Sequence, residues 1–546
     1  MPCFLNILIF LRIFYFYKLV INCFAFCFRA CQKMIKTRTI HEKNEPATNT
    51  IIPTVKIRKQ GETKIMKSNI TDMTQGSPTR HILLFALPTL IGNIFQQIYN
   101  LADSIIVGNY VGSEAFAAIG ATSSITFLFF ALCNGIGSGG GVVVSQYYGA
   151  RDDRNVKKCI VNSGIIMLIT PVIFGILGFT LSPLLLRLLE TPENIMADAV
   201  LYTRFMSVGL LFVSLYNFLS SMLKALGDSK SPLYFLIIST IINVVMDILF
   251  VVVIPMGIMG AALATVIAQF ISVLLCAVYA YKKNPYFRIS REDITVSFKM
   301  IGKIVRLGVP MSLQFALIAV SSMALQRVVN GFGTTAITAF TATNRIEQFI
   351  HQPYMTLAAS LATFSGQNFG AKRNDRVLAG YKKSLLIMVI LTAFLMLAMQ
   401  TFGQMLISFF ISNEEENAAA VIALGAKGLR ITSLFYLSLG MIYVVRGVLT
   451  GIGDAFFALF NGIIEVIGRF TIPLLLTAYL GYGEAGIWLS SGLVWLLSGV
   501  TAWIRYKAYF RSKVDIPEKS VSSLISSKRK ALQGRSLHAL SHKYHS

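Results

Sequence analysis

The chain has 546 residues and a formal net charge of +24, yet only 14% of its residues are charged and 55% are apolar. Soluble proteins carry about 25% charged residues, so this composition excludes an ordinary soluble domain. The Lys and Arg residues gather in short loops between apolar runs, which indicates membrane orientation rather than nucleic-acid binding.

The N-terminal region, residues 1–79, forms an extension of doubtful status. Residues 4–28 are apolar but contain Arg12 and Lys18, and no small-residue cleavage site follows, so a secretory signal fits poorly. Two interpretations remain open. One is a thirteenth membrane helix. The other, which we prefer, is a start site assigned too far upstream, because Met66 opens a short polar leader of the kind that precedes a first membrane helix.

Twelve apolar runs follow, and each is long enough to cross a hydrocarbon layer about 30 Å thick. Their approximate bounds are 82–108, 115–146, 159–180, 200–223, 232–254, 258–281, 303–330, 337–366, 384–410, 419–449, 456–479 and 485–506. We therefore expect an all-α integral membrane protein with twelve transmembrane helices.

The two halves of this region repeat each other at a nearly constant offset, which indicates an internal duplication. The matching pairs are Pro88 with Pro310, Gln146 with Gln367, Gly149 with Gly370, Gly227 with Gly453, and Gly260 with Gly486. The twelve helices should therefore form two homologous six-helix bundles. Repeats with an even number of spans enter the membrane from the same side.

The loops set the orientation of the spans. Basic residues concentrate in the loops after spans two, six and eight, whereas the opposite loops are mostly acidic. The positive-inside rule therefore places the basic loops and both termini in the cytoplasm. The expected division is 1–79 extension, 80–282 first six-helix lobe, 283–302 cytoplasmic linker, 303–511 second six-helix lobe and 512–546 basic cytoplasmic tail.

Acidic and amide residues inside the spans of the first half are candidates for a site. A charge at bilayer depth costs roughly 2.5–3.5 kcal/mol, so it calls for a functional explanation. Asn243 and Asp247 are four residues apart and share a helix face. By helical rise, Asp103 lies about 32 Å along its span, Asp247 about 23 Å and Thr265 about 12 Å, which puts all three in the outer half of the membrane. Either they share one cation site, or each separately caps a helix break or bonds a neighbouring backbone.

The second half does not repeat these acids, since Leu325 corresponds to Asp103 and Pro473 to Asp247. Glu465 and Arg469 stand four residues apart on one predicted helix, and we expect them to neutralise each other. The two halves therefore share one fold but differ in chemistry.

Glu347 and His351, also four residues apart, are candidates for a substrate-binding or proton-relay site together with Gln314. His351 is the only histidine inside a predicted span, and an ordinary histidine pKa of about 6.5 suits a proton relay. A structural hydrogen-bond cluster fits these residues equally well.

Motifs of enzymes are missing from the sequence. The glycine-rich stretch 135–141 follows an apolar helix and has no strand before it, so it does not match a dinucleotide-binding loop. There is also no phosphate-binding loop of the Gly-x-x-x-x-Gly-Lys type and no Cys-x-x-Cys pair. We expect a protein that is not an enzyme and needs no cofactor.

The region from about residue 80 to 511 resembles the multidrug and toxic compound extrusion (MATE) transporters. The matching segments are Leu87-Pro88, Asp103 with Val107-Gly108, Gln146–Ala150, Ala225–Asp228, Gly257–Thr265 and Gln367–Ala371. The resemblance implies two six-helix lobes around a V-shaped cavity. It also implies a coupling-cation site at Asp103, Asn243 and Asp247, with Thr265 as a weaker match, where Na⁺ or H⁺ binds. This sequence has no obvious acid in span seven, where some members carry one.

The resemblance further implies a secondary antiporter in the cell membrane that exports lipophilic, often cationic, drug-like molecules in exchange for H⁺ or Na⁺. We expect a monomer in the bilayer with no nucleic-acid partner. A flippase for lipid-linked oligosaccharides of related fold is one alternative, which the cationic Arg469 keeps open. A channel or non-transporting receptor is another alternative. A channel needs a continuous polar path, however, and such apolar membrane spans do not suggest one.

Overall fold

A computed structural model describes residues 69–411 and 417–513, and no strand occurs among them. The apolar segment 4–28 and nearly all of the basic tail lie outside the described residues. Contacts divide the chain into two units, Met1–Ala502 and Trp503–Ser546. The second unit contributes only the end of the last helix to the described residues, and all features below belong to the first.

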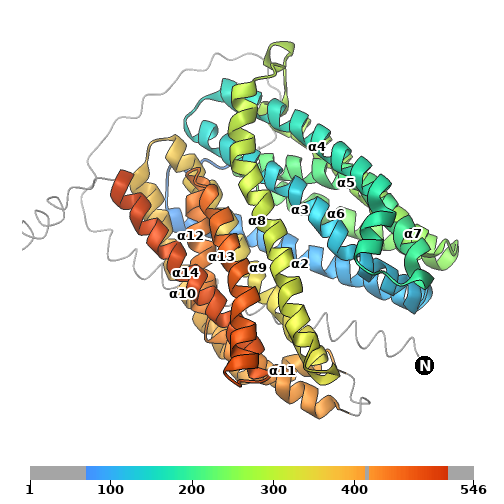
Figure 1. Cartoon of the computed structure of the whole chain (residues 1–546). Helices are drawn as coiled ribbons and strands as arrows, with labels where there is room; N and C mark the ends of the chain where they lie inside the picture. Colours follow the sequence, from blue (N-terminus) through green and yellow to red (C-terminus); the bar gives the residue numbers. More distant parts are fainter. Residues whose placement is uncertain (1–68, 412–416, 514–546) are drawn as a thin grey trace, which may run out of the picture. The chain divides into compact units, whose positions relative to one another are not determined.

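The helices of the first repeat run from the N-terminal end in chain order (Figure 1). They are α2 (Pro78–Tyr110), α3 (Ser113–Gly149), α4 (Asp153–Leu188), α5 (Glu193–Ala225), α6 (Lys230–Asp247) with the π-helical η1 (Ile248–Val253), and α7 (Gly257–Lys283). Two short 3₁₀ turns, η2 (Pro285–Phe287) and η3 (Arg291–Asp293), form the linker.

The second repeat has the same order of elements. They are α8 (Phe298–Asn330), α9 (Thr334–Gly370), α10 (Asn374–Ser408), α11 (Ala418–Ser433), α12 (Tyr436–Gly451), α13 (Phe456–Leu474) with the π-helical η4 (Leu475–Tyr479), and α14 (Ala485–Lys513). Ten helices in the described ranges are long and apolar enough to cross a membrane, and the bent pair α11–α12 makes eleven. The remaining long helix is α9, whose polar residues lower its hydropathy, so the pattern fits the predicted twelve spans.

The predicted tenth span, 419–449, is not one straight helix. It consists of α11 and α12, which meet at an angle of 52°. The Nε2 of Gln400 on α10 donates to the carbonyl oxygen of Arg430 at 2.9 Å and to Ser433 Oγ at 2.9 Å. Because side chains that bond a helix carbonyl compete with its own ladder, this contact explains the break in physical terms. No proline marks the break, but the hydroxyls of Thr432 and Ser433 also donate to carbonyl oxygens of α11, and such bonds often bend helices.

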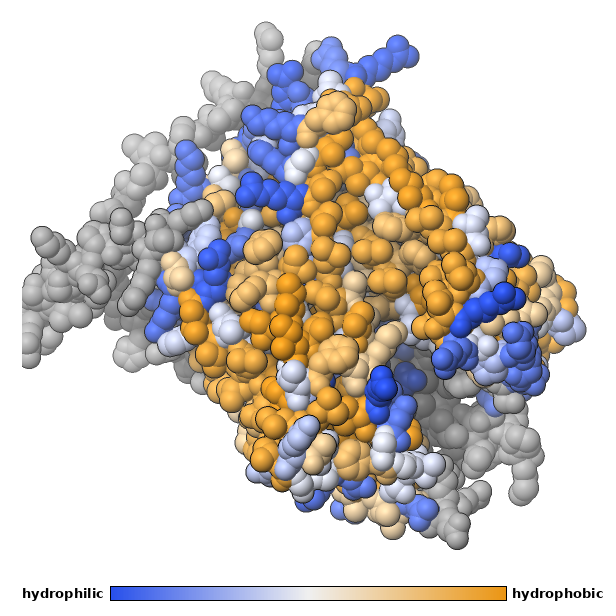
Figure 2. Space-filling model, in the orientation of Figure 1, coloured by the Kyte–Doolittle hydropathy of each residue, from blue (hydrophilic) through white to orange (hydrophobic). Residues whose placement is uncertain are grey.

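The outer faces of the helices are hydrophobic, as a bilayer requires. On α4 the exposed residues include Leu168, Ile169, Val172, Ile173 and Ile176. Figure 2 shows a broad hydrophobic surface on the face in view, with hydrophilic residues gathered toward its ends. These features agree with an integral membrane protein.

The backbone repeats its special conformations in the two halves. Arg151 and Lys372, which follow α3 and α9, have positive φ values of 60° and 59°. The turns before α6 and α13 each use a glycine with positive φ, Gly227 at 87° and Gly453 at 95°. Both η1 and η4 follow the helix after that turn. The duplication seen in the sequence therefore extends to individual dihedral angles.

Glycines bring the two repeats into close contact. On α3, a Cβ added to Gly135 would lie 2.3 Å from the Ser312 nitrogen of α8, and one added to Gly139 would lie 2.5 Å from the Gly308 nitrogen. At the end of the bundle where the basic loops lie, which we call the basic-loop end, Gly149 faces Gln367. A Cβ there would lie 1.8 Å from the Gln367 carbonyl oxygen. The stretch 135–141 therefore permits helix packing, as small residues do in membrane proteins.

We expect Gly149→Ala to lower the thermal stability of the detergent-solubilised protein, because backbone would have to move at the contact with Gln367. Overpacking of this kind costs about 1–3 kcal/mol. Gly120→Ala on α3 is the matched control, since nothing lies within 4 Å of its added Cβ. Alanine is the better helix former by up to about 1 kcal/mol, so the control should melt no lower than the wild type. Equal melting temperatures for the two variants would contradict the close contact.

Candidate functional site: a buried polar cluster in the first repeat

Three neighbouring helices of the first repeat carry the predicted residues. Asp247 is the last residue of α6, and Asn243 lies one turn earlier. Thr265 lies on α7, and Asp103 lies on α2, which packs against α6. The change to π-helix directly after Asp247 widens the turn there, and such local π-helices are frequent at functional sites.

Hydrogen bonds to Thr265 join these helices. The hydroxyl of Tyr99 donates to Thr265 Oγ1 at 3.2 Å, and Asn243 Nδ2 donates to the same oxygen at 3.5 Å. Asp103 lies one helical turn after Tyr99 on α2, and Asp247 lies one turn after Asn243 on α6. The structure therefore brings all four predicted residues into one cluster.

The cluster contains buried oxygen atoms without donors. Among the described residues, both carboxylate oxygens of Asp247, Oδ1 of Asn243 and Oδ1 of Asp103 lie buried with no hydrogen-bond partner. Asn243 and Asp247 are completely buried. An unpaired buried acceptor costs free energy, and a charged one costs more. Oxygen atoms of carboxylates and amides are also the ligands that hard cations such as Na⁺ prefer, so the donor set fits a cation or a proton.

Two tyrosines of the cluster were not predicted from the sequence. Tyr99 lies one turn before Asp103 on α2, so an i, i+4 search from Asp103 would have found it. Tyr202 on α5 is buried in the same hydrophobic cluster as Val107 of α2 and Val251 of η1. It comes from a helix that carries none of the predicted site residues, so the search from those residues did not reach it.

A second buried cluster lies in the second repeat and is centred on Arg446 of α12. Its guanidinium Nη2 donates to Asn461 Oδ1 at 2.8 Å and to Glu465 Oε1 at 3.1 Å. The predicted pairing of Glu465 with Arg469 is therefore wrong. Arg469 instead donates to Ser322 Oγ at 3.1 Å. Pairing between helices depends on their rotation, which the four-residue spacing within α13 does not reveal.

The three candidates of the second repeat do not form one group of mutual bonds. The amide oxygen of Gln314 accepts from Nε of Arg446 at 3.0 Å. His351 Nδ1 lies 3.2 Å from the hydroxyl of Tyr443, whose ring also contacts Arg446. Glu347 lies near Thr432 and has one buried oxygen without a partner in the described residues. The role of these residues in a proton relay stays a prediction.

Comparisons with known proteins agree with the fold and the duplication. The MatE family model matches residues 88–249 and 310–474, one segment in each repeat. The probable multidrug resistance protein YpnP of Bacillus subtilis is 32% identical over 80% of this chain and 96% of its own. The multidrug export protein MepA of Staphylococcus saprophyticus is 24% identical over 78% of this chain and 91% of its own.

Solved structures share the architecture. A crystal structure of MATE in complex with MaL6 has a TM-score of 0.77 at 22% identity, and covers 82% of this chain and 99% of its own. A MOP superfamily transporter of Pyrococcus furiosus, for which a reverse polarity of the binding pocket suggests a different function, has a TM-score of 0.76 at 22% identity with the same coverage. The predicted architecture of two homologous six-helix bundles is confirmed. From the matches in both repeats and along most of the chain, this protein belongs to the MatE family of membrane transporters.

Proposed function

We propose that the protein is a secondary antiporter that exports lipophilic, drug-like molecules, cationic ones among them, in exchange for H⁺ or Na⁺. The coupling ion binds at Asp103, Asn243 and Asp247, with Thr265 beside them. The observation that carries the proposal is the set of buried oxygen atoms on the first three of these residues that find no donor within the described part of the chain. The names of the bacterial relatives, a multidrug resistance protein and a multidrug export protein, support the substrate class.

The coupling follows from the chemistry of the cluster. A proton or Na⁺ that binds the carboxylates removes the cost of burying their charge, so the occupied cluster differs in free energy from the empty one. If a cationic substrate binds favourably only when these charges are free, then ion and substrate weaken each other's binding by the same factor. An ion gradient can then drive export against the substrate gradient.

The proposal places the protein in the cell membrane as a monomer, with the basic-loop end in the cytoplasm. The loop that contains Arg151 and Arg154 and the loop that contains Lys372 and Arg373 both lie at this end. Basic residues in short loops favour the cytoplasmic side, which supports this orientation.

A second candidate function is transport of an anionic substrate such as a lipid-linked sugar. Arg469 favours it, because Nε of this arginine is buried and has no partner in the described residues. Arg446 does not add to this argument, since Glu465 already balances its charge. Among the described residues, Asp103 and Asp247 form no ion pair with a basic residue, which favours the cationic class.

The proposal is tested by efflux of ethidium from proteoliposomes that contain the purified protein, with pH and Na⁺ gradients imposed separately. We expect one of the two gradients to accelerate ethidium efflux. Collapse of that gradient by an ionophore should then stop the accelerated efflux. Efflux that ignores both gradients would refute antiport. Transport of an anionic dye in place of ethidium would favour the second candidate.

A further inference from the structure

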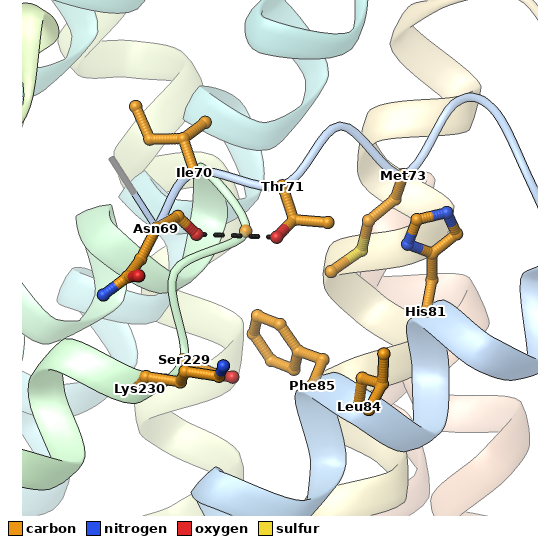
Figure 3. A pocket seen from close by; sticks show the side chains of 10 residues that line it. Asn69, Ile70, Thr71, Met73, His81, Leu84, Phe85, Ser229 and Lys230 are labelled. Carbon is orange, nitrogen blue, oxygen red and sulfur yellow. Dashed lines mark hydrogen bonds between the residues drawn. The ribbon is translucent and has the colours of Figure 1, made fainter. Parts of the chain in front are cut away.

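A short segment before α2, Asn69–Gly76, crosses the basic-loop end; we call it the strap (Figure 3). Its first half contacts the first repeat. The Thr71 nitrogen donates to the Leu226 carbonyl oxygen at 3.4 Å, and Asn69 Nδ2 lies 3.3 Å from Ser231 Oγ. These bonds are long and only partly buried.

The second half of the strap binds the second repeat more tightly. The Met73 nitrogen donates to Gln367 Oε1 at 2.9 Å, and the Met73 carbonyl oxygen accepts from Asn368 Nδ2 at 3.2 Å. Gln367 and Asn368 are completely buried, and Met73 is 1% exposed. Short bonds in a buried setting therefore fasten the strap to the end of α9.

Two arginines of the second repeat extend this attachment. Arg376 donates to the carbonyl oxygens of Met73 at 3.0 Å and Gly76 at 2.9 Å, and Arg373 donates to that of Thr74 at 3.0 Å. Together with the bonds from Gln367 and Asn368, five hydrogen bonds join the strap to the second repeat. Because the strap continues directly into α2, these bonds tie the two repeats together.

Asp72 keeps the strap in its bent form. Its Oδ1 accepts from the nitrogen of Thr74 at 2.9 Å and from its hydroxyl at 2.6 Å, and its Oδ2 pairs with Arg151. Burial by itself raises the pKa of Asp72, but the bonds from Thr74 and Arg151 outweigh it and hold this pKa below its ordinary value. The Arg151 side chain is 64% exposed, so the ion pair contributes little and the main attachment is the buried bonds to the second repeat.

The strap also covers a hollow. A cavity of about 260 Å³ lies between the strap, the start of α2 and the turn before α6, and its lining includes Thr71, Phe85 and Lys230. Figure 3 shows the side chains of Met73, His81 and Phe85 around this space. The first half of the strap therefore borders open space on one side, while Ile70 and Thr71 pack against the first repeat on the other.

The linker before α8 occupies the corresponding place in the second repeat, and its bonds differ. The Tyr286 hydroxyl donates to Asp153 at 2.7 Å, and the Ser297 nitrogen donates to Asn162 at 2.8 Å. Both partners lie on α4 of the first repeat. The linker therefore also joins the two repeats, through α4 of the first repeat, much as the strap joins them through α9 and α10 of the second.

We propose that the strap is a releasable latch: its five bonds to α9 and α10 hold the two repeats together at the basic-loop end and break each time that end opens. In the orientation proposed above, this is the cytoplasmic opening of the transport cycle. The latch goes beyond the ion and substrate sites, and its operation does not depend on which ion is coupled.

The test uses two glutamines that occupy equivalent positions. Gln146 Nε2 donates to the Gly451 carbonyl oxygen at 2.9 Å, and Gln367 Nε2 donates to that of Ala225 at 3.0 Å, so each makes the same bond between the repeats. Only Gln367 also accepts from the strap. Gln146→Leu and Gln367→Leu therefore lose the same bond between repeats, and their difference isolates the latch.

Spin labels at Arg154→Cys and Asn374→Cys, in a background without the native cysteines, report the distance across the basic-loop end. We expect Gln367→Leu to raise the ratio of open to closed populations at least about fivefold above that of Gln146→Leu, because a buried donor on the strap is left unpaired. Equal distance distributions in the two variants would overturn the latch.

A second measurement does not rely on those variants. Thr74→Cys and Arg373→Cys in the same background can be joined by a reducible bis-methanethiosulfonate, which ties the strap to the second repeat. We expect ethidium turnover to fall to background after cross-linking and to return after reduction, while each single-cysteine protein keeps the same turnover before and after the reagent. Full turnover in completely cross-linked protein would overturn the proposal. Failure of the antiport proposal would instead appear as ethidium turnover that does not depend on either the pH or the Na⁺ gradient.

Discussion

Asp103→Asn should abolish ion-driven efflux while the protein still inserts and folds. Asparagine keeps the size of the side chain and one oxygen but removes the charge. Two unit charges about 4 Å apart interact by about 4 kcal/mol at an effective dielectric constant of 20, so loss of one carboxylate weakens cation binding by roughly a thousandfold. The measurement is ethidium efflux from proteoliposomes under a pH or Na⁺ gradient.

Glu347→Gln and His351→Ala serve as the comparison for Asp103→Asn. They belong to the second repeat, where Glu347 has its own unpaired oxygen and His351 contacts Tyr443. We expect each to weaken efflux less than Asp103→Asn does. Complete loss of efflux in either variant with normal expression, or unchanged efflux in Asp103→Asn, would show that the coupling site does not lie in the first repeat.

Arg446→Met should have the largest effect on stability. The side chains of Arg446 and Glu465 are only 15% and 8% exposed, and their atoms lie 3.1 Å apart. Removal of one partner from a buried ion pair leaves an uncompensated charge and costs about 3–5 kcal/mol. We expect little folded protein, measured as monodisperse protein after extraction and as melting temperature in detergent.

The double variant Arg446→Met/Glu465→Gln separates charge burial from packing. Because no unpaired charge remains, it should recover most of the stability that Arg446→Met loses. Arg345→Met on α9 is the control for loss of an arginine as such, since Arg345 is exposed. A double variant as unstable as the single one would show that shape, rather than charge, makes Arg446 necessary.

The sequence predicts the repeats and the first cluster well for physical reasons. Apolar runs reveal spans because a bilayer tolerates few charges, and Asn243 and Asp247 share a face because a helix turns every 3.6 residues. The cluster around Arg446 was not predicted, since its partners Asn461 and Glu465 lie on another helix and their meeting depends on helix rotation. The strap was missed because a short polar segment has no periodicity.

The helix breaks were also beyond the sequence. Gln400 ends α11 from a neighbouring helix, so its effect requires the tertiary structure. The π-helical turn after Asp247 likewise has no signal in the sequence, although it repeats after Leu474, where no acid is present. The π-helical turn therefore does not require an acid beside it.

The contact between Gly149 and Gln367 has a counterpart between Gly370 and Gln146, and an added Cβ would meet the opposite carbonyl oxygen at 1.8 Å in both. Such a contact is self-complementary, like the isologous interface of a twofold-symmetric homodimer. Two identical six-helix subunits, inserted in the same direction, would satisfy it without any change. Fusion of two gene copies into one chain therefore required no new interface at this point, and it freed each copy to evolve its own chemistry.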